Sequence, residues 1–172
     1  MKVVLLPFIA LTIAGSAAAQ AGTAVSGVGT IYTVAKNNLI RAAEQMPEAD
    51  YSFQATKDVR TFGQLVGHVA DANFMFCSMV TGEANPNKGS LEKTVTAKAD
   101  LVKGLKDAFA FCDKAYQIGD SKGLEAADLF GMKTNKVGVL AFNAGHDMEH
   151  YGNIVTYMRL KGMVPPSSQP RN

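Results

Sequence analysis

The stretch HDMEHYGNIVTYMRLKG, His146–Gly162, belongs to a segment whose apolar residues recur every three or four positions. On a helical wheel His150 lies about 40° from His146, so both imidazoles share one face. Gly162 stands where a left-handed residue ends a helix, and Pro165 follows shortly after it. The stretch therefore predicts a long final helix that begins near residue 136 and carries two histidines on one side.

Three earlier segments show the same periodicity. The first covers residues 25–45, and MPEADYSFQATKDVR then interrupts it as a loop. The second covers residues 61–80 and opens with Thr61 three residues before Gln64, which is the spacing of a capping box. The third covers residues 90–116, with a serine as its cap. Four amphipathic segments joined by short links predict an all-α fold, a four-helix bundle.

The connection SKGLEAADLFGMKTN, residues 121–135, should add at most a short turn of helix. No segment shows the alternation of apolar and polar residues that a half-buried strand has. We therefore expect one helical domain, residues 22–172, without strands.

The first residues, MKVVLLPFIALTIAGSAAAQAG, read as a cleaved signal peptide, residues 1–21. An early lysine precedes a short apolar run, and small residues follow in A-x-A patterns at Ala17–Ala19 and Ala19–Ala21. Cleavage is expected before Gln20 or Gly22. The run is shorter than a spanning helix needs, so we expect an exported protein, periplasmic or secreted, with no stable membrane anchor.

Charge and composition exclude one class of partner. The formal net charge is +2, and the basic residues are scattered rather than gathered on one face. Nucleic acid is therefore not an expected partner. A small-molecule ligand or substrate of unknown identity is expected instead, and a homodimer stays open.

His68 is the third histidine of the chain and lies on the apolar side of the second predicted helix. Together with His146 and His150 it forms a set of three imidazoles on inward faces, which is able to bind one metal ion and leave positions open. A single histidine on an apolar stripe is more often a core residue, so the joint pattern carries the argument.

HDMEH also matches the H-x-x-E-H motif of inverted zinc peptidases. Only 22 residues follow His150, too few for the downstream ligand and α/β scaffold of that class.

Metal-bound imidazoles usually donate their second N–H to a carboxylate or a carbonyl. Asp71, Glu149 and Asn153 border the histidine faces on the wheels and are candidates for this supporting role. Asp147, about 100° from the first histidine of its helix, is expected on the solvated surface. Asn73, about 140° from the histidine of the second helix, is expected to lie away from the site.

Two cysteines remain. Cys77 lies about 180° from His68 on the second helix, so it points away from the metal face. Cys112 lies on the third helix. An even pair in a short exported chain favours a disulfide between Cys77 and Cys112, although two buried thiols remain the alternative.

The segments GHVADANFMFCS and GHDMEHYGNIVTYMRLKGMVPPSS, with VRTFGQL ahead of the first, resemble the DinB-like family of metal-binding four-helix bundles, in its exported branch. Members of that family bind a divalent metal through one histidine of the second helix and two, four apart, of the fourth. These ligands match His68, His146 and His150. Characterised relatives include thiol S-transferases and a thiol-dependent isomerase, which implies a metal that activates a thiolate or a water.

Two classes of function follow. The first is a metal-dependent hydrolase or transferase of unknown substrate, with zinc or nickel as the expected ion and iron as a further candidate. The second is a non-catalytic protein that binds a metal or a small ligand. No serine, cysteine or lysine lies on the histidine face, so catalysis would be centred on the metal and no catalytic side chain is assigned. The sequence has no evident arginine cluster for an anionic thiol, which makes thiol transfer the less favoured reaction.

Overall fold

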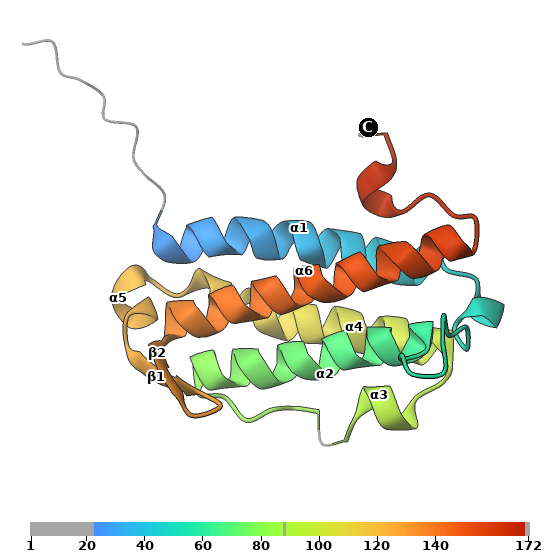
Figure 1. The fold of residues 1–172 in the computed structure, drawn as a ribbon. Coiled ribbons are helices and arrows are strands. Elements are labelled where there is room, and N and C mark those ends of the chain that lie inside the picture. Colours follow the sequence, from blue (N-terminus) through green and yellow to red (C-terminus); the bar gives the residue numbers. More distant parts are fainter. Residues whose placement is uncertain (1–22, 88, 171–172) are drawn as a thin grey trace, which may run out of the picture.

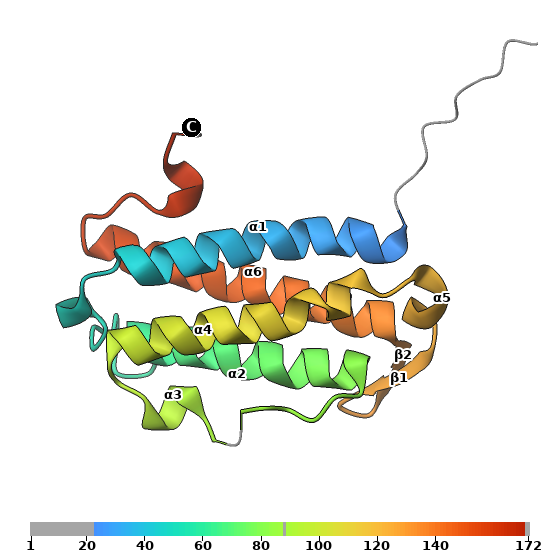
Figure 2. The same cartoon turned by 180° about the vertical axis from the view of Figure 1, so that it is seen from behind.

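Four long helices make up most of the computed structural model, which describes residues 23–87 and 89–170 (Figure 1). These helices are α1 (Ala24–Gln45), α2 (Phe62–Thr81), α4 (Lys98–Asp113) and α6 (Lys136–Leu160). Helix α6 packs against both α1 and α2, and α4 packs along the far side of α2 (Figure 2). The prediction was an all-α fold, and the structure confirms that the fold is mostly helical.

The ends of α2 and α6 follow the local signals in the sequence. Thr61 and Gln64 form the predicted capping box, in which each side chain binds the backbone N–H of the other residue. The side chain of Asn135 caps α6 by accepting a hydrogen bond from the backbone N–H of Gly138. Gly162 has the predicted left-handed backbone, with φ of 73°. The two helices that carry the histidines therefore start and stop where short-range rules place them.

Short elements connect the long helices. They are η1 (Glu48–Asp50), α3 (Leu91–Thr94), η2 (Ala115–Gln117), α5 (Asp120–Gly123), β1 (Ala126–Leu129), β2 (Met132–Asn135) and η3 (Pro166–Ser168). The predicted third helix, residues 90–116, is thus divided into α3 and α4. Ser90 precedes α3 but does not cap it with its side chain, and its hydroxyl donates to Asp71 instead.

The hairpin of β1 and β2 corrects the expectation that residues 121–135 contain no strand. The strands are antiparallel, with Ala126 opposite Asn135 and Leu129 opposite Met132. Two residues, Phe130 and Gly131, form the turn, and both have positive φ, as a type I′ turn requires. Strands of four residues are too short to show a clear alternation, so periodicity alone did not reveal them.

The core is one continuous cluster between the long helices. Its largest fully buried side chains include Leu39, Phe62, Leu105, Phe109, Leu140, Ile154 and Met158. A disulfide between Cys77 of α2 and Cys112 of α4 lies within this core, with the two Cα atoms 5.2 Å apart. Helices α2 and α4 are therefore joined covalently as well as by packing.

The predicted signal peptide, residues 1–21, lies outside the described residues. Within the described part of the chain, none of the helices combines the length and the apolar character that a bilayer crossing requires.

Candidate metal centre

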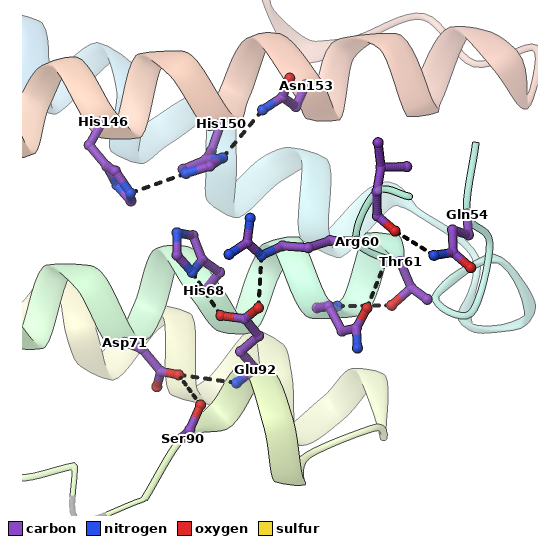
Figure 3. Close-up of polar contacts among 12 residues, drawn as sticks. Gln54, Arg60, Thr61, His68, Asp71, Ser90, Glu92, His146, His150 and Asn153 are labelled. Carbon is purple, nitrogen blue, oxygen red and sulfur yellow. Dashed lines mark hydrogen bonds and ion pairs between the residues drawn. The ribbon is translucent and has the colours of Figure 1, made fainter. Parts of the chain in front are cut away.

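The three histidines meet between α2 and α6. His68 projects from α2 toward His146 and His150, which lie one turn apart on α6 (Figure 3). One ring nitrogen from each histidine lies within 4.8 Å of the other two. The tertiary structure thus brings together the three residues that the sequence proposed as a set.

The spacing of the donor atoms suits one small ion. Nε2 of His146 lies 3.1 Å from Nε2 of His150. Two nitrogens bound to the same ion at about 2.1 Å, with an angle between about 90° and 110°, are separated by about 3.0 to 3.4 Å. The observed separation falls inside this interval, so the pair on α6 is already placed as two ligands of one ion would be.

Glu92 of α3 orients His68. Its Oε2 lies 2.8 Å from Nδ1 of His68, and its Oε1 accepts a hydrogen bond of 2.7 Å from Nε of Arg60. Burial raises the pKa of Glu92, but the hydrogen bonds from Arg60 and His68 outweigh it and lower the pKa below its ordinary value. Because an ionised carboxylate accepts the Nδ1 proton, the lone pair of His68 is left on Nε2, which faces the other two rings.

Asp71 holds Glu92 in place rather than contacting an imidazole, which corrects its predicted role. Its carboxylate accepts hydrogen bonds from the backbone N–H groups of Leu91 and Glu92. It also accepts from the side chains of Asn87 and Ser90. Asp71 therefore anchors the start of α3, the element that presents Glu92 to the site.

Close packing between α2 and α3 allows Glu92 of α3 to contact His68 of α2. An alanine Cβ at position 67 would meet the backbone nitrogen of Glu92 at 2.6 Å and its Cα at 2.7 Å. Only glycine allows the backbone of α3 to lie this near to α2. Glu92 was missed by sequence reasoning, and the one available signal was Gly67, a glycine in a helix interior directly before His68.

Of the two residues of α6 that were predicted to support an imidazole, Asn153 contacts one and Glu149 does not. The side-chain amide of Asn153 lies 3.3 Å from Nδ1 of His150. A half-turn of that amide presents its oxygen as the acceptor for an Nδ1 proton. Glu149 is exposed on the outer face of α6. Asn153 is thus the residue of this pair that contacts an imidazole.

The environment keeps the α6 histidines neutral. Burial lowers the pKa of His146 to about 4, and the charges of His150, His68 and Arg60 add to this effect. Burial likewise lowers the pKa of His150, with His68 contributing. Neutral imidazole is the form that binds a metal ion, so the site is prepared for ligation near neutral pH.

Asp147 is fully buried, which corrects the expectation that it lies on the solvated surface. Its Oδ1 accepts a hydrogen bond of 2.7 Å from the amide of Asn73, and burial raises its pKa to about 8. Asn73 also accepts from the amide of Asn143 at 3.1 Å. A helical wheel with one buried face failed here because α6 packs against α1 as well as α2, so two of its faces are covered. Asn73 belongs to this buried polar cluster and not to the histidine site.

One pocket adjoins the histidines, and a second adjoins residues that support them. An apolar pocket of about 340 Å³ is lined by His68 and His146 themselves, together with Asp71, Ala72, Met75, Phe76, Phe130 and Phe142. A more polar pocket of about 500 Å³ is lined by Lys57, Asp58, Val59, Arg60, Gln64, Leu65, Glu92, Asn153 and Tyr157. The first touches the imidazoles directly, and the second touches the residues that support them.

Comparison with solved structures identifies the fold. A DinB-like protein from Bacillus cereus ATCC 10987 superposes with a TM-score of 0.72 and 17% identity, over 82% of this chain and 95% of that chain. A mycothiol-dependent maleylpyruvate isomerase superposes with a TM-score of 0.64 and 14% identity, over 78% of this chain and 63% of that chain. These likenesses show a shared fold.

Comparison of sequences identifies the family. The uncharacterised protein YjoA of Bacillus subtilis (strain 168) is 23% identical over 122 residues, which cover 70% of this chain and 79% of that protein. The model of the DinB family matches residues 32–171, a span that includes all three histidines. The chain therefore belongs to the DinB family.

Proposed function

We propose that His68, His146 and His150 bind one divalent metal ion, with zinc or nickel favoured and iron as a further candidate. The observation that carries this proposal is the meeting of three imidazoles from two helices, with the Nε2 atoms of His146 and His150 3.1 Å apart. The orientation of His68 by an ionised carboxylate supports it further, because bound histidines usually have such a partner.

The proposed activity is that of a metal-dependent hydrolase or transferase acting on a small molecule. Three protein ligands leave coordination positions open, and a bound ion there lowers the pKa of a water or thiol. The chain itself supplies the orientation of the ligands: Glu92 holds His68, and Asn153 lies against His150. The apolar pocket, which His68 and His146 line, gives a substrate access to the histidines.

Non-catalytic binding is the second candidate function. It is favoured by the hydrogen bonds that already occupy the carboxylates of Asp71 and Glu92. Among the described residues that line the apolar pocket, Asp71 is the one acidic residue, and its oxygens are occupied by the start of α3. Glu92 is occupied by His68 and Arg60. Neither of these two carboxylates is free to take a proton from a substrate.

We further propose that the protein is exported. The disulfide between Cys77 and Cys112 supports this, because such bonds persist in oxidising compartments and are rare in the cytoplasm. Non-reducing mass spectrometry of protein recovered from each cell fraction tests it. Oxidised protein that begins at residue 20 or 22 is expected outside the cytoplasm, and full-length reduced protein inside the cell would contradict the proposal.

Metal analysis of protein purified without an affinity tag tests the binding site. We expect about one divalent ion per chain in the wild type and a sharp loss of metal in each single variant His68→Ala, His146→Ala and His150→Ala. The control is Glu149→Ala, which removes an exposed side chain next to His150 and should keep the metal. A triple alanine variant that retained one ion per chain would refute the assignment.

Turnover assays separate the two candidate functions. Metal-loaded wild type should be tested on ester, amide, phosphoester and thiol-transfer substrates, with His150→Ala as the blank. Activity that follows metal content across the histidine variants supports the enzyme. Stoichiometric metal without activity on any of these substrates favours the binding protein.

A further inference from the structure

The apolar pocket beside the histidines has an aromatic wall built from three elements of the chain, α2, α6 and the turn of the hairpin. Phe76 of α2 lies with its ring centroid 5.3 Å from that of Phe142 on α6 and 5.7 Å from that of His146. Phe130, from the turn of the hairpin, adds its ring 5.9 Å from Phe76 and 6.4 Å from Phe142. Three aromatic rings thus gather next to a proposed metal ligand.

Phe130 occupies this position at a cost to the backbone. It is the one residue other than glycine with a positive φ among the described residues, at 55°. Left-handed backbone is disfavoured for a bulky residue, and type I′ turns usually have asparagine, aspartate or glycine there. The ring is also 60% exposed, so burial does not explain the choice of residue. Residues with a strained backbone are concentrated at active sites and ligand-binding sites, where the strain is kept because the site needs that residue in that position.

Two of the three rings face an opening rather than the core. Phe76 is almost fully buried, whereas Phe142 is 43% exposed and Phe130 more so, and the rings line an opening of about 340 Å³. Two of the three histidines, His68 and His146, line the same opening. Any group seated against the rings is therefore in direct reach of the imidazoles.

We propose that this pocket receives a compact apolar group of the substrate or ligand, of about the size of a benzene ring, with the group that binds the metal directly attached to it. Phe130, Phe76 and Phe142 form the wall that selects this group, and Phe130 closes its outer side. This inference rests on the proposed metal site, because the ion would hold the other end of the same molecule.

Two hydroxamates test the proposal by binding, without any need for turnover. Acetohydroxamate and benzohydroxamate present the same chelating group and differ in a methyl against a phenyl substituent. Isothermal titration of the zinc-loaded full chain should show benzohydroxamate binding roughly tenfold tighter or more, as burial of a ring predicts. The ratio is corrected by the affinities of the two compounds for free zinc in the same buffer.

The variant Phe130→Asn tests the wall itself. Asparagine tolerates the left-handed backbone, so the hairpin should be retained while the ring is lost. The preference for benzohydroxamate should fall by roughly threefold or more, while the affinity for acetohydroxamate stays unchanged. The matched control is Leu124→Asn, which removes an apolar side chain that is 66% exposed and lies outside the pocket. Its preference should equal that of the wild type.

The outcomes distinguish a failure of the apolar pocket from a failure of the proposed metal site. If the chain holds zinc and binds both hydroxamates equally, the apolar pocket is not a recognition site and the inference fails alone. An unchanged preference in Phe130→Asn overturns the role given to Phe130. If the chain holds none of zinc, nickel and iron, and neither compound binds, the proposed metal site fails and the inference fails with it.

Discussion

Replacing Gly67 by alanine should loosen the support of His68 without touching any histidine. The added Cβ would lie 2.6 Å from the backbone nitrogen of Glu92 and 2.8 Å from the carbonyl carbon of Leu91. Both contacts are with backbone atoms, so no flexible side chain is able to move aside. The short helix α3 must therefore shift away from α2.

The size of the shift follows from these distances. Raising the shortest contact from 2.6 Å to an ordinary separation of about 3.4 Å needs a displacement of about 0.8 Å. The same displacement, directed away from α2, lengthens the contact of 2.8 Å between Glu92 and His68 to about 3.6 Å, beyond hydrogen-bonding range. Overpacking costs about 1–3 kcal/mol, and the better helix propensity of alanine offsets about 1 kcal/mol of it. Loss of the carboxylate partner should weaken metal binding about 10-fold to 100-fold.

Two measurements check this reasoning, namely chemical denaturation of the metal-free protein and competition of the metal-loaded protein with a chelator. The matched control is Gly152→Ala in α6, where an added Cβ meets nothing within 4 Å. That variant should gain about 0.5–1 kcal/mol and keep its metal affinity. Combining Gly67→Ala with Glu92→Gln should give less than the sum of the two losses in affinity, because both act on one contact. A Gly67→Ala protein that matched the Gly152→Ala control in stability and affinity would refute the role of the α2–α3 contact.

Three further predictions concern the core. The double variant Cys77→Ala/Cys112→Ala should lose about 4 kcal/mol in the free energy of unfolding measured with denaturant, because the bond closes a loop of 35 residues. Asp147→Asn should unfold at nearly the same denaturant concentration as the wild type, since the raised pKa of about 8 keeps this buried carboxyl mostly protonated at neutral pH; a loss as large as that of Asp147→Ala would contradict a neutral carboxyl. Burial raises the pKa of Tyr32 and Tyr51. Above about pH 10 the unfolded chain therefore releases phenol protons from these two residues that the native protein keeps, so stability should fall as pH rises, and the phenolate absorbance of these two tyrosines should appear only with unfolding.

The histidine site shows how far sequence reasoning reached. His146 and His150 are four residues apart on one helix, so the helical period alone places their rings together. His68 required one more step, namely that two apolar faces of long helices pack against each other. Each step uses a short-range rule and the burial of apolar surface, and the structure shows the three rings together.

The supporting residues were predictable only in part. Asn153 lies one turn from His150 on the same helix, so its contact follows from the helical period. Glu92 comes from α3, whose position depends on the glycine contact at Gly67 and on the anchor that Asp71 provides. Neither contact has a period in the sequence, and each depends on elements folded far from their neighbours along the chain.

The sequence by itself determined the helices α1, α2 and α6, the capping box of α2, the glycine end of α6 and the pairing of imidazoles, because backbone hydrogen bonding and amphipathic periodicity act over a few residues. Only the tertiary structure decided which second face of α6 is buried, and it thereby placed Asp147 in the core. It also decided that a hairpin of four-residue strands brings Phe130 to the pocket that His68 and His146 line. The physical reason is the same in both cases. Burial of a second helix face and the docking of a short hairpin depend on the shape of the assembled helices, and no local pattern of residues encodes that shape.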